Sequence, residues 1–178
     1  MNQTSTVCRT RRGVTLPGPR EFRPRIVREH QPRYSITSAE IAARYWKRHV
    51  TQAPWFDDER EIVVVLSCNV KNHILSFSLV AIGTVNSCTV HPRDVFRPAI
   101  AQNACAIVLM HNHPSGDPRP SVADGHWTKV IFESAGCLMI RFLDHIIVGA
   151  DRTFFSFSGA GALESGHIAI RRHKRSQF

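Results

Sequence analysis

An apolar run, a pair of histidines and the start of a helix follow one another in the stretch Ile107-Val-Leu-Met-His-Asn-His-Pro-Ser-Gly-Asp-Pro-Arg-Pro-Ser-Val-Ala-Asp124. The apolar residues, followed by prolines and a glycine, predict a buried strand that ends in a loop. Side chains two residues apart on a strand point to the same face, so His111 and His113 are expected to face the same way. Two imidazoles can then converge on one metal ion.

A helix is predicted to begin at Ser121, directly after Pro120 and ahead of apolar residues at roughly helical spacing. Positions three apart share a helical face, so Ser121 and Asp124 can both look from the first turn toward the histidines. Ser-x-x-Asp is also typical of a helix-capping box, in which the serine binds a backbone N–H and the acid favours the positive helix end. Both interpretations stay open, because a capping serine can also serve a site.

Two imidazoles, one carboxylate and a water fill the four positions of a catalytic zinc, with protein ligands at ~2.0–2.2 Å. Magnesium and calcium prefer more oxygen ligands. We therefore predict a Zn²⁺ cofactor bound by His111, His113 and Asp124, although this pattern does not separate zinc from manganese or iron. Zinc lowers the pKa of a bound water toward about 7, and a nearby carboxylate must still move the proton.

The pattern His111-x-His113-Pro114, followed by Ser121 and Asp124, resembles the JAMM (MPN+) metalloprotease motif. Other segments are similar to the RadC branch of that family, and the resemblance runs from about Ser38 to Ala160. In chain order these segments are Gly83-Thr-Val-Asn86, His91-Pro-Arg93, His111-Asn-His-Pro-Ser-Gly-Asp-Pro118, Pro120-Ser-x-x-Asp124 and Leu143-Asp-His-Ile-Ile-Val-Gly149.

The resemblance implies a single α/β domain with a JAB/MPN-type mixed, partly curled sheet packed with helices. It also implies zinc-dependent hydrolysis of an amide or isopeptide bond in a peptide or protein substrate. The metal ligands would be His111, His113 and Asp124, and Ser121 would hydrogen-bond the developing oxyanion.

The general base implied by the resemblance is a glutamate near the start of the first core strand. The matching acidic segment is Asp57-Asp-Glu-Arg-Glu61, directly before a β-branched apolar run. We predict Glu61 as this base, with Glu59 as the alternative because both lie on one face of an extended segment. Many RadC-like chains also carry acidic residues shortly before the Gly-Thr pair, whereas residues 77–82 contain none. A base supplied from that position would be missing here.

Periodicity and turn residues predict the remaining elements, and their alternation of strands and helices is typical of an α/β fold. His91 is interpreted as a helix entry rather than a ligand. Asp144 and His145 are interpreted as a hydrogen-bonded structural pair, with the orientation of a metal ligand as the alternative. Helices are predicted over 38–50, 92–103 and 121–134, and strands over 62–66, 73–82, 105–110, 138–148 and 153–157.

The composition, with 178 residues of which 43% are hydrophobic, suits one domain with a sizeable core. No apolar run approaches the ~18 residues of a membrane span and no signal peptide is apparent, so we expect a cytoplasmic protein without membrane contact. The five cysteines are widely spaced, which argues against a disulfide framework. Cys68, Cys105 and Cys137 are expected to be buried as small hydrophobic residues.

The net charge of +9 is concentrated at the two ends of the chain. Residues 1–33 hold eight arginines and two glutamates, and residues 171–178 hold four further basic side chains, which leaves the intervening chain close to neutral. This pattern predicts a disordered basic arm over 1–35 and a basic tail over 161–178, and the resemblance implies a RadC-like MPN/JAMM domain over 36–160 between them.

The arm could neutralise phosphates without recognising sequence, which would give non-specific nucleic-acid binding. The resemblance to RadC also carries an association with DNA repair, so the alternative function is a DNA-repair-associated nucleic-acid-binding or scaffold module with a catalytically silent metal site. The sequence predicts no oligomeric state.

Overall fold

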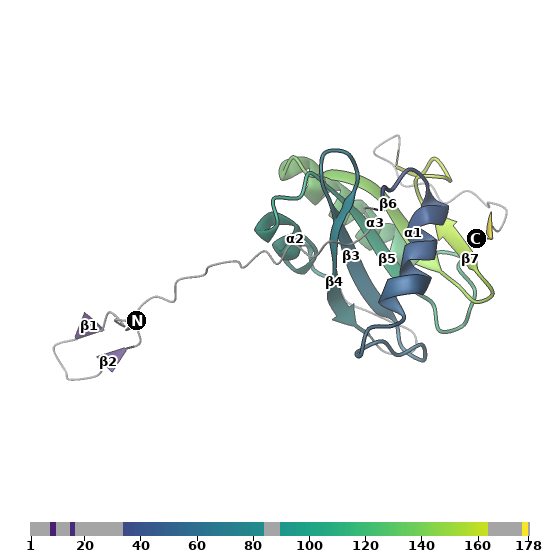
Figure 1. Ribbon diagram of the computed structural model, residues 1–178, viewed down its shortest axis with the longest axis horizontal. Helices are drawn as coiled ribbons and strands as arrows, with labels where there is room; N and C mark the ends of the chain where they lie inside the picture. The colour runs from purple at the N-terminus through teal and green to yellow at the C-terminus, as the bar shows by residue number, and fades with distance from the viewer. Residues whose placement is uncertain (1–7, 10–14, 17–33, 84–89, 164–175, 178) are drawn as a thin grey trace.

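One sheet with helices on both faces forms the core of the protein (Figure 1). The computed structural model describes residues 34–83 and 90–163, together with the backbone of three short strands outside these ranges. The elements are β1 (Cys8–Arg9), β2 (Thr15–Leu16), α1 (Ala39–Tyr45), the π-helix η1 (Trp46–Val50), β3 (Ile62–Cys68), β4 (Ile74–Ile82), α2 (Pro92–Ala101), β5 (Ala106–Asn112), α3 (Val122–Cys137), β6 (Arg141–Val148), β7 (Thr153–Ser156) and β8 (Ser176–Gln177).

The sheet has the strand order β4-β3-β5-β6-β7-β8 and mixes two pairing directions. β3 pairs antiparallel with β4 and with β5, whereas β5 pairs parallel with β6. Every residue of β3 and of β5 is buried. This burial explains why both strands are continuously apolar over most of their length: each has both faces covered. The predicted α/β fold with a mixed sheet and helices is confirmed.

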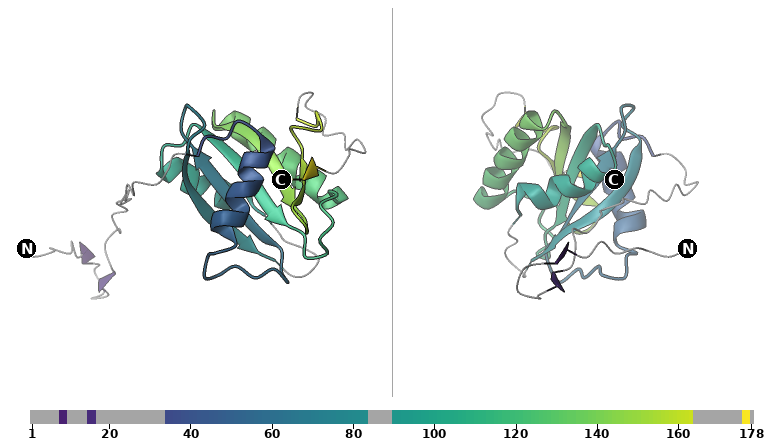
Figure 2. Two further views of the ribbon diagram at one scale, coloured as in Figure 1. Left: turned by 45° about the vertical axis from the view of Figure 1, so that its right-hand side comes forward. Right: turned by 90° about the vertical axis from the view of Figure 1, so that its left-hand side faces the viewer.

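The alternation of side chains along β5 directs consecutive residues to different layers. Ala106, Val108 and Met110 pack into the core beneath α1 and η1. Ile107 and Leu109 pack into the core formed with α2 and α3, and Figure 2 shows these helices on the opposite side of the sheet from α1. The same period of two carries on to the end of the strand, so the next odd-numbered residue, a histidine, lies on the α3 side.

Three expectations about boundaries and burial are modified by the structure. The helix predicted over 38–50 changes from α to π geometry at Trp46. β6 begins three residues later than predicted, because Met139 takes a left-handed φ of 54° in the turn after α3. Cys105 and Cys137 are exposed, so their predicted burial is wrong, while Cys68 is buried. The two exposed cysteines lie just before β5 and at the last residue of α3, where packing is incomplete.

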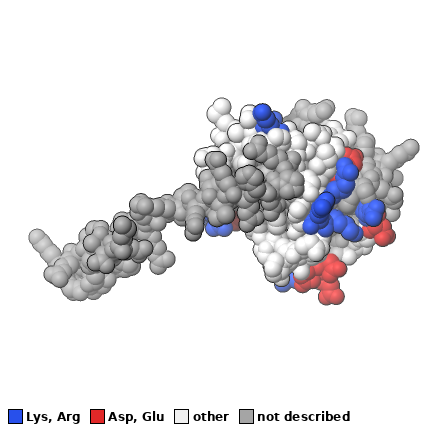
Figure 3. Space-filling view, viewed as in Figure 1, with Lys and Arg blue, Asp and Glu red and all other residues white. Residues whose placement is uncertain are grey.

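Most of the predicted arm over 1–35 and of the predicted tail over 161–178 lies outside the described residues, as does the segment 84–89. β1 pairs with β2, and β8 extends the sheet beside β7. Within the described part of the chain, no helix combines the length and apolar character needed to cross a bilayer. Figure 3 shows that basic and acidic side chains of the described residues both occur on the α1 face of the core.

Candidate metal centre

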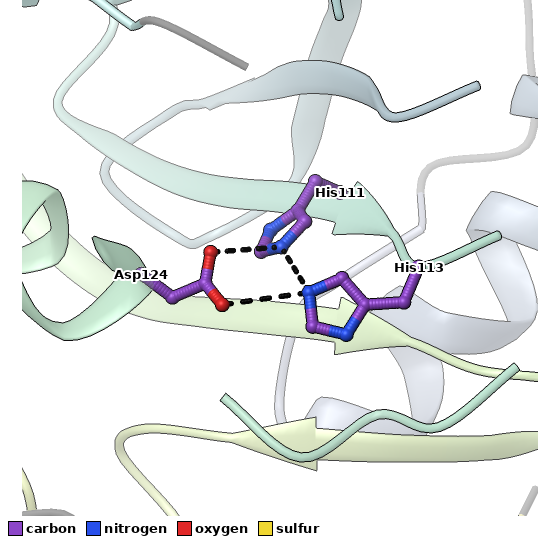
Figure 4. A group of neighbouring side chains, drawn as sticks. All are labelled: His111, His113 and Asp124. Carbon is purple, nitrogen blue, oxygen red and sulfur yellow. Dashed lines mark hydrogen bonds and ion pairs between the residues drawn. The ribbon is translucent and has the colours of Figure 1, made fainter. Parts of the chain in front are cut away.

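Three side chains that could hold a metal ion meet where β5 ends and α3 begins. His111 is the sixth residue of β5, His113 follows directly after the strand, and Asp124 lies in the first turn of α3. Figure 4 shows the two imidazoles and the carboxylate pointing toward one another. His111 and Asp124 are buried and His113 is partly buried. The structure thus brings together the three residues that the sequence predicted as metal ligands.

The donor atoms of this group lie close enough together to hold one metal ion. Nε2 of His111 lies 3.1 Å from Nε2 of His113 and 3.2 Å from Oδ1 of Asp124. Nε2 of His113 lies 3.4 Å from Oδ2 of Asp124. Ligands bound at ~2.0–2.1 Å in tetrahedral geometry are separated from one another by roughly 3.3–3.4 Å. Each nitrogen lies beside a different oxygen of the Asp124 carboxylate, and one donor atom from each of the three residues lies within 4.8 Å of the other two, so the group can hold one metal ion.

His113 is held by a loop that is tied to the end of β6. Its backbone N–H donates to Val148 at 3.0 Å, and its carbonyl accepts from Gly116 at 2.9 Å. The carbonyl of Gly116 in turn accepts from the N–H of Ala150 at 2.9 Å. Nδ1 of His113 lies 2.8 Å from the carbonyl oxygen of Asp117, which can only accept, so Nδ1 carries the proton. In the neutral ring, Nε2 is then the nitrogen with a lone pair, and it faces the other two ligands.

Asp124 is oriented by the start of its own helix. Ser121 is the N-cap of α3, and its hydroxyl accepts from the N–H of Asp124 at 3.1 Å. Oδ2 of Asp124 accepts from the N–H and from the hydroxyl of Ser121, both at 2.7 Å, while Oδ1 accepts from Nε1 of Trp127 at 3.2 Å. The capping-box interpretation of Ser121 and Asp124 is confirmed, and it leaves the carboxylate beside both histidines.

The electrostatics of the group favour a negative carboxylate beside cationic partners. Burial alone would raise the pKa of Asp124, but hydrogen bonds from His111, His113 and Ser121 hold it far below its usual range. Burial alone would lower the pKa of His113, yet Asp124 raises it above the ordinary value. His111 is fully buried, and desolvation lowers its pKa despite the same carboxylate. The carboxylate of Asp124 thus favours positive charge at the place where a cation would bind.

Glu61 lies directly before β3 and is half-buried, whereas Glu59 is exposed. Burial raises the pKa of Glu61, and its carboxyl also experiences the charges of His113 and Asp124. Asn112 fixes the backbone on both sides of Glu61, because its side chain bonds to Ile62 and to the residue before Glu61. Of the two glutamates weighed from the sequence, Glu61 is the one in electrostatic contact with the site.

Two further side chains of α3 belong to the site although the sequence analysis missed them. Trp127 bonds to the Asp124 carboxylate, and Thr128 bonds to the Asp124 carbonyl. Both follow Asp124 by three or four residues, so helical spacing from the predicted ligand was the signal that could have found them. His91, by contrast, caps α2 through its Nδ1, which accepts from Arg93 at 3.3 Å, as predicted.

The side chains of Asp144 and His145 have separate partners. Asp144 accepts from the hydroxyl of Ser156 at 2.5 Å and from the N–H of Ser158 at 2.9 Å, which fits the structural role weighed for it. Nε2 of His145 lies 2.9 Å from Nδ1 of His111, which instead fits the alternative of a residue that orients a ligand.

A pocket of about 400 Å³ opens beside His113 on the α1 side of the sheet. Its wall combines the aromatic rings of Trp46 and Phe56 with charged residues of both signs, which are Lys47, Arg152, Asp58 and Asp151. The pocket touches only His113 among the three candidate ligands, so it lies next to the metal centre rather than over it.

Comparison with known proteins agrees with this architecture. The family profile described as RadC-like JAB domain matches residues 36–162. A UPF0758 protein of Chlorobaculum parvum is 48% identical over 101 residues, which cover 57% of this chain and 45% of the relative. A UPF0758 protein of Bacillus cereus (strain AH187) is 42% identical over 149 residues, which cover 83% of this chain and 61% of the relative. The chain thus spans roughly half to three fifths of the length of these relatives, and by the match over most of its own length it belongs to the RadC-like JAB domain family.

Proposed function

We propose that this protein is a zinc-dependent hydrolase that cleaves an amide or isopeptide bond in a peptide or protein substrate. The observation that carries the proposal is the convergence of two imidazole nitrogens and one carboxylate, whose candidate donor atoms lie within 4.8 Å of one another, a ligand set that suits catalytic zinc. Membership of the RadC-like JAB family supports it. Zinc bound by His111, His113 and Asp124 would polarise the scissile carbonyl and make an attacking water more acidic.

Glu61 would act as the general base, taking a proton from the attacking water and returning it to the leaving amine. Its half-buried position and its electrostatic contact with His113 and Asp124 support this role. Glu59 is the weaker candidate because it is exposed in the loop before β3 and its backbone bonds to Asp57.

Ser121 would donate a hydrogen bond to the oxyanion that develops on the substrate. Its hydroxyl lies 2.7 Å from the Asp124 carboxylate, which places it one hydrogen bond away from a ligand. The hydroxyl proton is directed at Asp124 in this arrangement, so the role requires the Ser121 side chain to rotate toward the substrate.

The pocket beside His113 would receive the part of the substrate next to the scissile bond. Its aromatic wall at Trp46 and Phe56 suits apolar side chains, and its charged residues, two basic and two acidic, suit the polar groups of a peptide backbone.

The test measures metal content by mass spectrometry and hydrolysis of a peptide and isopeptide library in the wild type and three variants. About one zinc per chain is expected in the wild type and in Glu61→Gln, and none in His113→Ala. Hydrolysis is expected in the wild type and in the control variant His126→Ala, because the side chain of His126 is exposed on α3. No hydrolysis is expected in His113→Ala or in Glu61→Gln. Full zinc retention in His113→Ala would reject the ligand set, and normal hydrolysis by Glu61→Gln would reject the base.

A further inference from the structure

A chain of buried polar contacts leads from the candidate ligand His111 back to the helix that carries Asp124. Nδ1 of His111 lies 2.9 Å from Nε2 of His145, and Nδ1 of His145 lies 2.5 Å from the hydroxyl of Thr128. The Thr128 hydroxyl bonds to the backbone carbonyl of Asp124. His145 and Thr128 are 0% exposed and His111 is 1% exposed, so water does not compete for these contacts.

The direction of each hydrogen bond follows from the carbonyl at the end of this chain. A carbonyl oxygen can only accept, so the single hydroxyl proton of Thr128 is donated to Asp124. With its proton used, the hydroxyl can only accept from His145, and Nδ1 of His145 must carry a proton.

His145 is stacked on Phe157, with ring centroids 4.8 Å apart and planes at 6°, and its other neighbour is Trp127 at 4.6 Å. None of the hydrogen bonds described for its ring goes to a carboxylate. A doubly protonated imidazole here would carry an unpaired buried charge, which is strongly unfavourable. The neutral ring has its lone pair on Nε2, so Nδ1 of His111 must donate to it.

We propose that His145 and Thr128 are positioning residues that fix the tautomer of His111, with the proton on Nδ1 and the lone pair on Nε2. That lone pair faces His113 and Asp124, as a metal ligand requires. The inference rests on the proposed function only in taking these three residues as the metal site. It explains why a histidine and a threonine are buried beside the site without reaching it.

The two candidate histidine ligands differ in how their tautomers are set. His113 donates from Nδ1 to a backbone carbonyl, that of Asp117, which no side-chain substitution removes. His111 depends on two side chains, His145 and Thr128, which lie on β6 and α3. Substitution at Thr128 is therefore expected to act on one ligand and leave the other unchanged.

The first test locates the imidazole protons in the wild-type protein by nuclear magnetic resonance of nitrogen-15-labelled histidines. The expected result is a proton on Nδ1 of both His111 and His145. A proton on Nε2 in place of Nδ1 in either ring would overturn the proposal. This measurement needs neither zinc nor substrate, so it also decides the case in which a variant fails to fold.

The second test compares Thr128→Val, which keeps the side-chain volume but removes the hydroxyl, with Thr128→Ser, which keeps the hydroxyl. The measured quantity is the zinc dissociation constant, by competition with a chromogenic chelator. Zinc affinity is expected to fall about 10–100-fold in Thr128→Val and to stay within about threefold of the wild type in Thr128→Ser. Equal affinity in Thr128→Val and the wild type, or equally weak affinity in both variants, would overturn the proposal.

The two tests separate this inference from the proposed function. If the wild type binds no zinc while both rings carry the proton on Nδ1, the hydrolase proposal fails and the positioning role of His145 stands. If the wild type binds zinc while the tautomers are reversed, the positioning role fails alone.

Discussion

The side chain of Asn112 accepts a hydrogen bond from the backbone N–H of Ile62 at 2.8 Å, although the two residues are 50 positions apart. The same side chain donates to the carbonyl of Arg60 at 2.9 Å. Asn112 stands between the two histidines in the sequence, on the opposite face of β5 from His111. One residue therefore couples the strand of the metal ligands to the segment that carries Glu61.

Substitution of Asn112 by alanine is expected to lower the free energy of unfolding by about 1–3 kcal/mol, because the N–H of Ile62 would be buried without a partner. The rate of hydrolysis by Asn112→Ala should fall by more than the loss of folded protein accounts for, because the backbone beside Glu61 is no longer fixed. The variant should retain zinc. Asn112→Asp keeps the acceptor for Ile62 but not the donor, and it should lie between alanine and the wild type. Chemical denaturation and metal analysis measure both effects, and an alanine variant as stable as the wild type would contradict the role.

Asp144 predicts a specific dependence of stability on pH. Burial raises its pKa to about 7, although hydrogen bonds from Ser156 and Ser158 act to lower it. The unfolded carboxyl ionises near pH ~4, so between about pH 4 and pH 7 the unfolded chain has lost a proton that the folded chain keeps. This contribution to stability is complete below about pH 4 and is lost as the pH rises to about 7.

The side chain at position 144 cannot ionise in the variant Asp144→Asn. The free energy of unfolding of this variant, relative to that of the wild type, should therefore rise by about 2–3 kcal/mol as the pH is raised from 5 to 8. Denaturant unfolding of both proteins across this range gives the difference, in which the other titrating groups cancel. A difference that does not change with pH would show that Asp144 titrates normally.

Gly149 lies so close to the loop of His113 that a larger residue has no space. A Cβ at this position would meet the carbonyl oxygen of Gly116 at 2.5 Å and the hydroxyl of Thr153 at 2.6 Å. Gly149→Ala should therefore lower the free energy of unfolding by about 1–3 kcal/mol and weaken zinc binding. The matched control is Gly136→Ala in α3, where a Cβ meets nothing within 4 Å and where alanine should stabilise the helix by about 0.5–1 kcal/mol. Thermal unfolding should show a lower melting temperature than the wild type for Gly149→Ala and a higher one for Gly136→Ala.

The arginine-rich arm leads to a prediction that is independent of the metal. With eight arginines in residues 1–33, the protein should bind DNA without sequence preference and lose that binding steeply as salt is raised. Deletion of residues 1–33 should remove the binding and leave hydrolysis intact. Fluorescence anisotropy with unrelated duplexes measures this, and binding that survives the deletion or ignores salt would contradict it. Binding by the arm and a cytoplasmic location stay predictions.

The strand–helix order and the three candidate ligands were predictable because local rules dominate there. The apolar run of β5 and the turn residues after it mark the end of a buried strand, and the Ser121 cap marks the start of α3. Because side chains alternate between the two faces of a strand, His111 lies on the face toward α3. These features depend on neighbours in sequence, so sequence alone was sufficient for them.

The partners of those ligands were less predictable because they depend on packing between distant segments. His145 pairs with His111 across neighbouring parallel strands, and the register shift between Ile107 and Val108 contributes to which residues of β6 face β5. Helical spacing from Asp124 could have pointed to Thr128, but its contact with His145 depends on packing between α3 and β6. The exposure of Cys105 and Cys137 likewise depends on how completely neighbouring elements cover the start of β5 and the end of α3. Amino-acid composition carries no information about this.

β5 is hydrogen-bonded to a strand on each side, and both of its faces are covered, so the backbone beside His111 opens only when the whole domain unfolds. The order of folding and metal binding follows from the position of His111 in this strand. A metal ion at His111, His113 and Asp124 is therefore expected to bind after the domain has folded, to a site whose shape the fold already sets. A chelator should thus strip the protein to a folded, inactive form that regains activity within the time of ion binding, without a refolding step.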